Sequence, residues 1–332
     1  MNIERKNLVG KLTSGSREEL MPSSGQSNTE STPQTIVQMR DGMGWPAKDI
    51  TTHSLLIENT VLKGHIPVRV YRKEKLKGKV LPVLVYYHGG GFFGGSIQNV
   101  EQICRTFADR ADLAVVSVGY RLSPENPFPA GLMDCYKVVE VLATEGHLFH
   151  ISSDKIFVAG DSAGGNLAIS VAILDASIMT TGYVKKIVSY YPVVDLTSKG
   201  KGEFWDTRAI KTQSEEEKEL VTEYINGFSS LEAQVEDWYC GASINRSNEL
   251  ISPLFASDKI LSQLPPVKII VGEFDPLRQQ VESFAEKLLA AKTEGSMTVY
   301  PGVIHAFMDK IGIYDEAEEG ILEGITFLKG DN

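Results

Sequence analysis

Cysteine and long apolar runs are both scarce in this sequence, and each shortage excludes a class of protein. Of the 332 residues only three are cysteine, namely Cys104, Cys135 and Cys240, which are too few and too scattered for a disulfide framework or a zinc site. We expect each of them to be a small apolar residue of the interior. No stretch approaches the roughly 18 apolar residues of a membrane-spanning helix, and the first residues contain no apolar segment typical of a signal peptide. These absences favour a cytoplasmic protein without a membrane span.

Positive charge is also in short supply. The chain has 33 lysines and arginines against 43 aspartates and glutamates, which gives a net charge of −10 and a pI near 5.2. Nucleic acids and anionic membranes are bound through a positive face, so we expect neither as a partner. The sequence contains no cluster of metal-ligand residues at metal-binding spacing, and it therefore predicts no metal and no cofactor.

Apolar runs alternate with helical patterns along most of the chain, whose residues are 42% hydrophobic. Two runs, at residues 53–59 and 65–73, predict strands joined by a short connection. Six further runs, apolar throughout and rich in β-branched residues, follow at residues 80–87, 113–120, 154–161, 185–192, 267–275 and 296–303. Strands of this kind, separated by helices, indicate a parallel sheet covered on both faces. The pattern predicts an α/β fold with an eight-stranded, mostly parallel sheet and helices on both faces.

Two segments fall outside this alternation. Residues 1–45 begin with a stretch rich in Ser, Thr, Gly and Pro, a composition typical of a partly mobile segment. The connection between the fourth and fifth of the six runs is about 70 residues long, whereas a βα crossover needs only a dozen or so. We interpret residues 199–250 as an inserted helical cap over the carboxyl ends of the strands, where α/β folds bind ligands. The core is then divided into residues 46–198 and 251–332.

Three successive glycines follow His88 at the end of an apolar run, in the stretch HGGG at residues 88–91. Each glycine that is fixed loses conformational entropy, so such a run needs a reason. Backbone N–H groups of glycine can approach an anion closely, and the anion is either a phosphate or a transient oxyanion. The stretch has no following Lys-Ser/Thr and does not open a helix as a G-x-G-x-x-G motif. We therefore favour an oxyanion.

The strongest motif is Gly160-Asp161-Ser162-Ala163-Gly164, which fits G-x-S-x-G. It lies directly after a predicted strand and directly before a predicted helix, the context of a nucleophile elbow. A sharp turn at the serine brings together the positions two before and two after it, so that side chains there would collide. The turn holds the serine hydroxyl in the open at the positive end of a helix. We predict that Ser162 is a nucleophile.

A serine nucleophile needs a base, and the base needs a carboxylate to orient it. Of the six histidines only His305 lies after Ser162, and it follows the last predicted strand. The carboxylate should end the preceding strand, where the sequence offers Glu273 and Asp275. We prefer Asp275, which stands directly before Pro276 at the predicted mouth of the strand, although Asp before Pro is also a good helix N-cap.

These motifs occur in one order along the chain, together with YRLSPENPFPA at residues 120–130, DPL at 275–277 and HAF at 305–307. In this order they resemble the hormone-sensitive-lipase-like esterases, a branch of the α/β hydrolases that includes the bacterial family IV carboxylesterases. The resemblance covers the chain from about residue 50 onward, and it implies an α/β hydrolase fold with a catalytic triad of Ser162, Asp275 and His305. It also implies an oxyanion hole formed by the backbone N–H groups of Gly90, Gly91 and Ala163.

The resemblance further implies that the N-terminal segment, residues 1–45, forms part of the cap together with residues 199–250. Three positions depart from the family pattern. Asn126 stands where the family often carries His, and Gln279 and Gln280 stand where acidic residues are usual. We expect these changes to alter loop contacts and hydrogen bonds near the site without touching the triad.

The resulting prediction is a serine carboxylesterase that hydrolyses small-molecule esters of short to medium acyl chain through an acyl-enzyme. Phe92, Phe93 and Trp205 are candidates for the walls of its substrate pocket. An amidase or aryl-amide deacetylase is an alternative, because the same triad cleaves both kinds of bond. A non-catalytic ligand receptor is disfavoured, because receptors of this fold lose the histidine that His305 supplies here. The strand at residues 296–303 is predicted as a sheet edge able to pair with another subunit in a homodimer.

Overall fold

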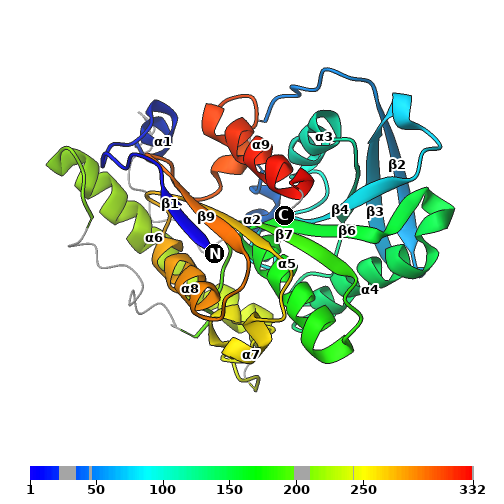
Figure 1. Ribbon diagram of the computed structural model, residues 1–332. Helices are drawn as coiled ribbons and strands as arrows, with labels where there is room; N and C mark the ends of the chain where they lie inside the picture. The colour runs from blue at the N-terminus through cyan, green and yellow to red at the C-terminus, as the bar shows by residue number, and fades with distance from the viewer. Residues whose placement is uncertain (22–34, 45–46, 198–209, 242, 331–332) are drawn as a thin grey trace.

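The computed structural model describes residues 1–21, 35–44, 47–197, 210–241 and 243–330, and one nine-stranded sheet forms its centre (Figure 1). From one edge to the other the strands are β1 (Asn2–Arg5), β9 (Gly295–Tyr300), β8 (Val267–Gly272), β7 (Val184–Tyr190), β6 (Ile151–Asp161), β4 (Leu81–Tyr87), β5 (Ala114–Val118), β3 (Ile66–Lys73) and β2 (Leu55–Leu62). Strand β3 is antiparallel to both of its neighbours, and the remaining neighbouring strands are parallel. The predicted α/β architecture with a mostly parallel sheet is confirmed.

The eight predicted strands are all present, and the ninth, β1, is the one that the sequence pattern misses. Its four residues are exposed except for the half-buried Ile3, so the strand carries no apolar signature. β1 pairs in parallel with β9, with Asn2 opposite Ser296. The prediction that β9 is an open sheet edge is therefore wrong, because the N-terminal segment already occupies that edge.

Helices cover both faces of the sheet (Figure 1). On one face α3 (Glu101–Arg110) packs beside α9 (Asp315–Lys329), and on the other lie α4 (Ala130–Glu145), α5 (Ala163–Ile173) and α8 (Arg278–Ala290). Strands β5 and β8 are buried at every position, because a parallel sheet between two helical layers has no face toward solvent. The loops that follow the parallel strands gather at the carboxyl ends of these strands, and the candidate site lies there.

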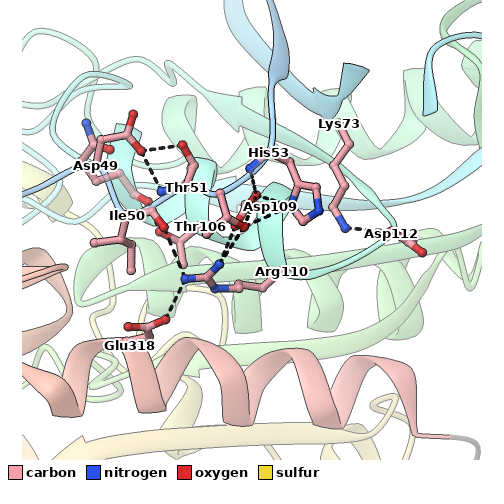
Figure 2. Close-up of polar contacts among 12 residues, drawn as sticks. Asp49, Ile50, Thr51, His53, Lys73, Thr106, Asp109, Arg110, Asp112 and Glu318 are labelled. Atoms are coloured by element: carbon pink, nitrogen blue, oxygen red, sulfur yellow. Dashed lines mark hydrogen bonds and ion pairs between the residues drawn. The ribbon is translucent and has the colours of Figure 1, made fainter. Parts of the chain in front are cut away.

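A polar network joins the chain before β2 to the helices of one face (Figure 2). The buried carboxylate of Asp109, on α3, accepts a hydrogen bond from the His53 N–H at 2.8 Å and lies 2.8 Å from His53 Nδ1. Arg110 pairs with the same carboxylate at 2.7 Å and with Glu318 of α9 at 3.0 Å. It also donates to the Ile50 carbonyl at 3.3 Å. A buried charge that is both paired and hydrogen-bonded is tolerated, so this network fixes the entry to β2 against α3 and α9.

The connection between β7 and β8 carries the longest of the described helices, α6 (Glu215–Cys240). Ser214 caps its N-terminus by accepting from the Glu217 N–H at 3.2 Å, and three glutamates occupy the first turn, where the helix dipole favours negative charge. α6 contacts the short helix α1 (Ser14–Leu20) through Arg17, which lies 2.6 Å from Glu216. None of the described helices combines the length and the apolar character that a membrane crossing requires.

A second, smaller apolar cluster lies apart from the main core, and we call it the cap-side cluster. It consists of Leu12, Ile210, Val221, Ile225, Phe274 and Ile304. Its members come from the N-terminal segment, from the chain before α6, from α6 itself and from the loops after β8 and β9. The N-terminal segment, the region of α6 and the loops after β8 and β9 therefore share one packing unit.

Candidate active site

The G-x-S-x-G motif forms a tight turn between β6 and α5. Ser162 lies at this turn with φ 54° and ψ −117°, in a region that costs a non-glycine residue about 1–3 kcal/mol. A Cβ on Gly160 would lie 2.3 Å from the Gly164 carbonyl oxygen, and a Cβ on Gly164 would lie 2.0 Å from the Tyr87 carbonyl oxygen. Both distances are far below van der Waals contact, so the two glycines are required for the main chain to pass β4 this closely.

His305 lies between Ser162 and Asp275. Its Nε2 is 3.0 Å from Ser162 Oγ, and its Nδ1 is 2.8 Å from Asp275 Oδ2. The other carboxylate oxygen of Asp275 accepts the Leu277 N–H at 2.8 Å, so the carboxylate is held from both sides. With the Nδ1 proton directed at the carboxylate, Nε2 is left as an acceptor for the serine hydroxyl.

The other candidate carboxylate, Glu273, has different partners. Its side chain accepts hydrogen bonds from the Gly10 N–H at 3.2 Å and from the Gly302 N–H at 2.9 Å. Burial raises the pKa of Glu273, against the opposing effect of these two N–H groups. Asp275 is therefore the carboxylate that the structure brings to His305.

The glycine loop lies beside Ser162, with Gly90 at φ +114° and Gly91 at φ +58°. The Gly90 carbonyl accepts from the Phe93 and Gly94 N–H groups at 3.2 and 2.8 Å, and a Cβ on Gly90 would lie 2.5 Å from the backbone of Gly94. Among the residues that the structure describes, the N–H groups of Gly90, Gly91 and Ala163 donate to no acceptor. They are available for an anion in the cavity.

His88 holds the base of this loop. Its ring stacks on Tyr120 with centroids 4.2 Å apart, and its Nδ1 lies 2.8 Å from the Gly89 carbonyl oxygen. The Tyr120 hydroxyl in turn donates to the His88 carbonyl at 2.7 Å. Burial lowers the pKa of His88 to about 4, so the ring is neutral at pH 7 and supports the loop as an uncharged group.

A cavity of about 300 Å³ is lined by Gly90, Gly91, Ser162 and His305. Apolar side chains form much of its wall, namely Phe92, Phe93, Val193, Leu196, Phe228, Val235 and Leu277. Phe92 also stacks on Tyr239 at 3.8 Å between centroids, and Phe93 meets Trp238 edge-on at 5.0 Å. The two phenylalanines thus line the cavity and anchor the glycine loop to α6. Trp205, the third predicted wall residue, lies outside the described residues.

Two acidic residues, Asp161 and Asp309, also line the cavity. Asp161 Oδ1 accepts from the Tyr86 hydroxyl at 3.0 Å, and burial raises the pKa of Asp161 to about 6. Burial and then the charge of Asp161 raise the pKa of Asp309 well above its usual range. The motif analysis assigns no role to either residue, and the only signal for Asp309 is its place four residues after His305.

Buried amide side chains hold the loop that follows β7 and forms one cavity wall. Gln280 Oε1 accepts from the Val194 and Asp195 N–H groups at 2.7 and 2.9 Å. Asn166 Nδ2 donates to the Val193 carbonyl at 2.8 Å. Gln280 is one of the predicted departures from the family pattern, and it contacts the loop as expected. Asn126, another of them, only donates back to its own loop.

The described residues contain no group of three or more His, Cys, Asp or Glu side chains placed to hold a metal ion. All three cysteines are buried as free thiols, and burial raises the pKa of each. Their thiolates are thereby disfavoured. Ser162 is thus the candidate nucleophile among the described residues that line the cavity.

Comparison with known proteins gives one consistent result. Residues 84–309 match a family described as having the alpha/beta hydrolase fold. An ethyl acetate hydrolase of Pseudomonas putida is 31% identical over 279 residues, which cover 81% of this chain and 80% of that protein. A carboxylesterase of Mycobacterium tuberculosis is 32% identical over 267 residues, covering 80% and 78% of the two chains.

Solved structures agree with the sequence relatives. A hyperthermophilic esterase from the archaeon Pyrobaculum calidifontis superposes with a TM-score of 0.69 at 32% identity, covering 89% of this chain and 88% of that one. A thermostable carboxylesterase cloned from a metagenomic library superposes with a TM-score of 0.70 at 30% identity, covering 85% and 90%.

Proposed function

The chain belongs to the α/β hydrolase family of carboxylesterases, and we propose that it cleaves esters through Ser162, His305 and Asp275. The observation that carries the proposal is the chain of contacts from Ser162 Oγ to His305 at 3.0 Å and on to Asp275 at 2.8 Å. A hydroxyl, a base and an orienting carboxylate at such distances form a general base system for acyl transfer.

In the first half-reaction Ser162 Oγ bonds to the ester carbonyl carbon while His305 Nε2 takes the hydroxyl proton. The tetrahedral intermediate then expels the alcohol, whose oxygen takes the same proton from His305. In the second half-reaction water attacks the acyl-enzyme with His305 again as base, and the carboxylic acid leaves with Ser162 restored.

The oxyanion of both tetrahedral intermediates is proposed to be bound by the N–H groups of Gly90, Gly91 and Ala163. Their freedom from other acceptors supports this assignment. Each fixed donor of this kind stabilises the transition state by about 3–4 kcal/mol, because the dipoles need no reorganisation when charge develops.

We propose short- to medium-chain acyl groups on small-molecule esters as substrates. A cavity of about 300 Å³ supports this range. An apolar acyl chain gains binding free energy only from the area that it buries, so carbons that extend beyond the cavity add little. Residues 199–250, together with the N-terminal segment, are proposed to form the cap. Phe228 and Val235 of α6 line the cavity, which supports this part of the proposal.

The test is a panel of p-nitrophenyl acetate, butyrate, octanoate and palmitate, with acetanilide as an amide, on wild type and Ser162→Ala. Ser162→Ala should lose turnover by about 10⁶-fold, whereas Ser170→Ala, a buried serine on α5, should keep it. Normal turnover by Ser162→Ala would refute the mechanism. Palmitate as best substrate would refute the chain-length range, and faster acetanilide cleavage would make the protein an amidase.

A further inference from the structure

Three distant segments meet behind the candidate triad, and we call this meeting point the Glu273 junction. The carboxylate of Glu273 bridges the Gly10 N–H at 3.2 Å and the Gly302 N–H at 2.9 Å. The Gly302 carbonyl accepts from the Thr13 N–H at 2.9 Å. Glu273 stands two residues before Asp275, and Gly302 stands three residues before His305. The junction therefore contacts both the loop that carries Asp275 and the loop that carries His305.

The backbones at this junction are as close as glycine allows. A Cβ on Gly10 would lie 2.5 Å from the Lys211 carbonyl oxygen, and a Cβ on Gly302 would lie 2.5 Å from the Lys11 carbonyl oxygen. Both glycines have positive φ, +66° and +70°. The Gly10 carbonyl also accepts from the Gln213 N–H at 2.8 Å. The chain that leads into α6 is thus part of the same contact.

Besides the contact of His305 with Asp275, two backbone hydrogen bonds join the loops after β8 and β9. The Glu273 N–H donates to the Tyr300 carbonyl at 2.8 Å, and the Phe274 N–H donates to the Val303 carbonyl at 3.0 Å. These bonds prolong the strand pairing but leave the Gly302 N–H without a backbone partner. The Glu273 carboxylate is the group that engages it, and so it sets where the turn before His305 lies.

We propose that Glu273 is a positioning residue, which holds the His305 loop in register with Asp275 by clamping Gly302 to the N-terminal segment. The proposal rests on the proposed function, since it assigns Glu273 a task only if His305 is the base. It makes the N-terminal segment a support of the catalytic loops in addition to a strand of the sheet.

The energetics of Glu273 fit a positioning role better than a purely stabilising one. The side chain is buried, with 5% of the residue exposed, and burial raises its pKa. An acid whose pKa is raised by folding is destabilised as the anion, so above that pKa the charged form lowers the free energy of unfolding. The same anion makes charge-assisted hydrogen bonds, which fix geometry more firmly than neutral ones.

The test compares Glu273→Gln with Glu319→Gln. Glu319 is the control, because it also contacts the N-terminal segment, through Lys6 at 3.5 Å, but lies on α9 and outside both triad loops. Gln at 273 keeps one acceptor and turns an N–H donor toward a second N–H, so it releases one side of the clamp. We expect kcat on p-nitrophenyl butyrate to fall about 10²-fold, as for a misplaced catalytic group, with KM changed less than about twofold.

Two further readouts separate positioning from loss of fold. The rate at which a fluorophosphonate labels Ser162 should fall in parallel with kcat, while the thermal midpoint of Glu273→Gln stays near that of wild type. In Glu273→Asp the shorter carboxylate reaches at most one of the two N–H groups, and we expect a smaller loss of kcat than in Glu273→Gln. If the Gln variant does not fold, the Asp variant takes its place in the test. A kcat within twofold of wild type in the folded variant would overturn the proposal. An inactive wild type would instead overturn the proposed function.

Discussion

The two halves of the candidate site are held by different means. On the nucleophile side, Ser162 and the glycine loop are fixed by main chain passing main chain, with glycines at the points of closest approach. On the base side, Gly10 and Gly302 also allow close main-chain approach, but a side chain, the Glu273 carboxylate, joins the loops of Asp275 and His305 to the N-terminal segment beside the cap-side cluster. The nucleophile side belongs to the main core, whereas the base side depends on segments contributed from both ends of the chain.

This difference decides how each half responds to change. A main-chain contact leaves no alternative geometry, so adding even one methyl group there should be severe. A contact made by a side chain can be tuned, because a longer, shorter or neutral replacement changes it by degrees. We therefore expect substitutions at the main-chain contacts of the nucleophile side to act on folding, and substitutions of the side chains on the base side to act mainly on rate.

After the loss expected from Ser162→Ala, the next largest loss of activity is expected on the base side, from Asp275→Asn. The Leu277 N–H, 2.8 Å from Asp275 Oδ1, will keep an oxygen facing it, so the new amide NH₂ must face His305. The imidazole then carries its proton on Nε2 and no longer accepts from Ser162. We expect kcat to fall about 10⁴-fold with little change in stability, measured by ester turnover and chemical denaturation. Retention of a tenth of the wild-type rate would contradict this role for Asp275.

On the nucleophile side, Gly164→Ala should destabilise the fold by more than about 3 kcal/mol. Its new Cβ would lie 2.0 Å from the Tyr87 carbonyl oxygen and 2.7 Å from that of His88, and neither backbone atom can move without disturbing β4. Gly227→Ala on α6 is the matched control, because no atom of the described residues lies within 4 Å of its added Cβ. It should stabilise the helix by about 0.5–1 kcal/mol. Equal urea midpoints for the two variants would show that the two sides do not differ in this way.

A smaller net effect, in the pH dependence of stability, arises from two opposed titrations on the nucleophile side. Burial lowers the pKa of His88 to about 4. As pH falls from about 6.5, His88 therefore binds a proton in the unfolded chain but not in the folded chain, and the free energy of unfolding drops. Burial raises the pKa of Asp161 to about 6, so over nearly the same range the folded chain gains a proton first, and stability rises. Each effect amounts to about 3 kcal/mol, and together they largely cancel.

Asp161→Asn should reveal the effect of the His88 titration on stability, which the Asp161 titration offsets in wild type. Without the aspartate, the free energy of unfolding should fall by about 3 kcal/mol more than in wild type between pH 7 and pH 4. His88→Gln should do the reverse and make the protein gain stability over that interval. Urea denaturation at unit steps of pH measures both slopes. Parallel curves for wild type and Asp161→Asn would rule out the opposing titration.

How far the sequence predicts this molecule follows from the same contrast. Gly160, Ser162 and Gly164 are predictable because the turn imposes glycine within five consecutive residues, and their neighbours are a strand and a helix with clear periodicity. His305 follows from chain order once Ser162 is assigned, and chain order narrows its carboxylate to Glu273 and Asp275. The eight apolar strands are equally clear, since burial on both faces leaves a continuous apolar run.

Three other features of the structure cannot be predicted from the sequence, for physical reasons. Strand β1 has four mostly exposed residues at a sheet edge, where neither face requires a pattern. Glu273 is bound by backbone N–H groups 263 and 29 residues away, and a backbone N–H has no residue type by which to find it. Asp309 is a wall residue because a short turn directs it into the cavity, which its spacing from His305 does not reveal.

The positive φ of Ser162 has a consequence for engineering. Because the turn suits glycine better than serine, selection of variants for heat resistance alone will favour losing the hydroxyl, and the gain in stability will come with a dead enzyme. A screen on this scaffold therefore has to couple survival at high temperature to turnover in every round. The residue that we propose as the nucleophile is also one that the backbone would fold more easily without.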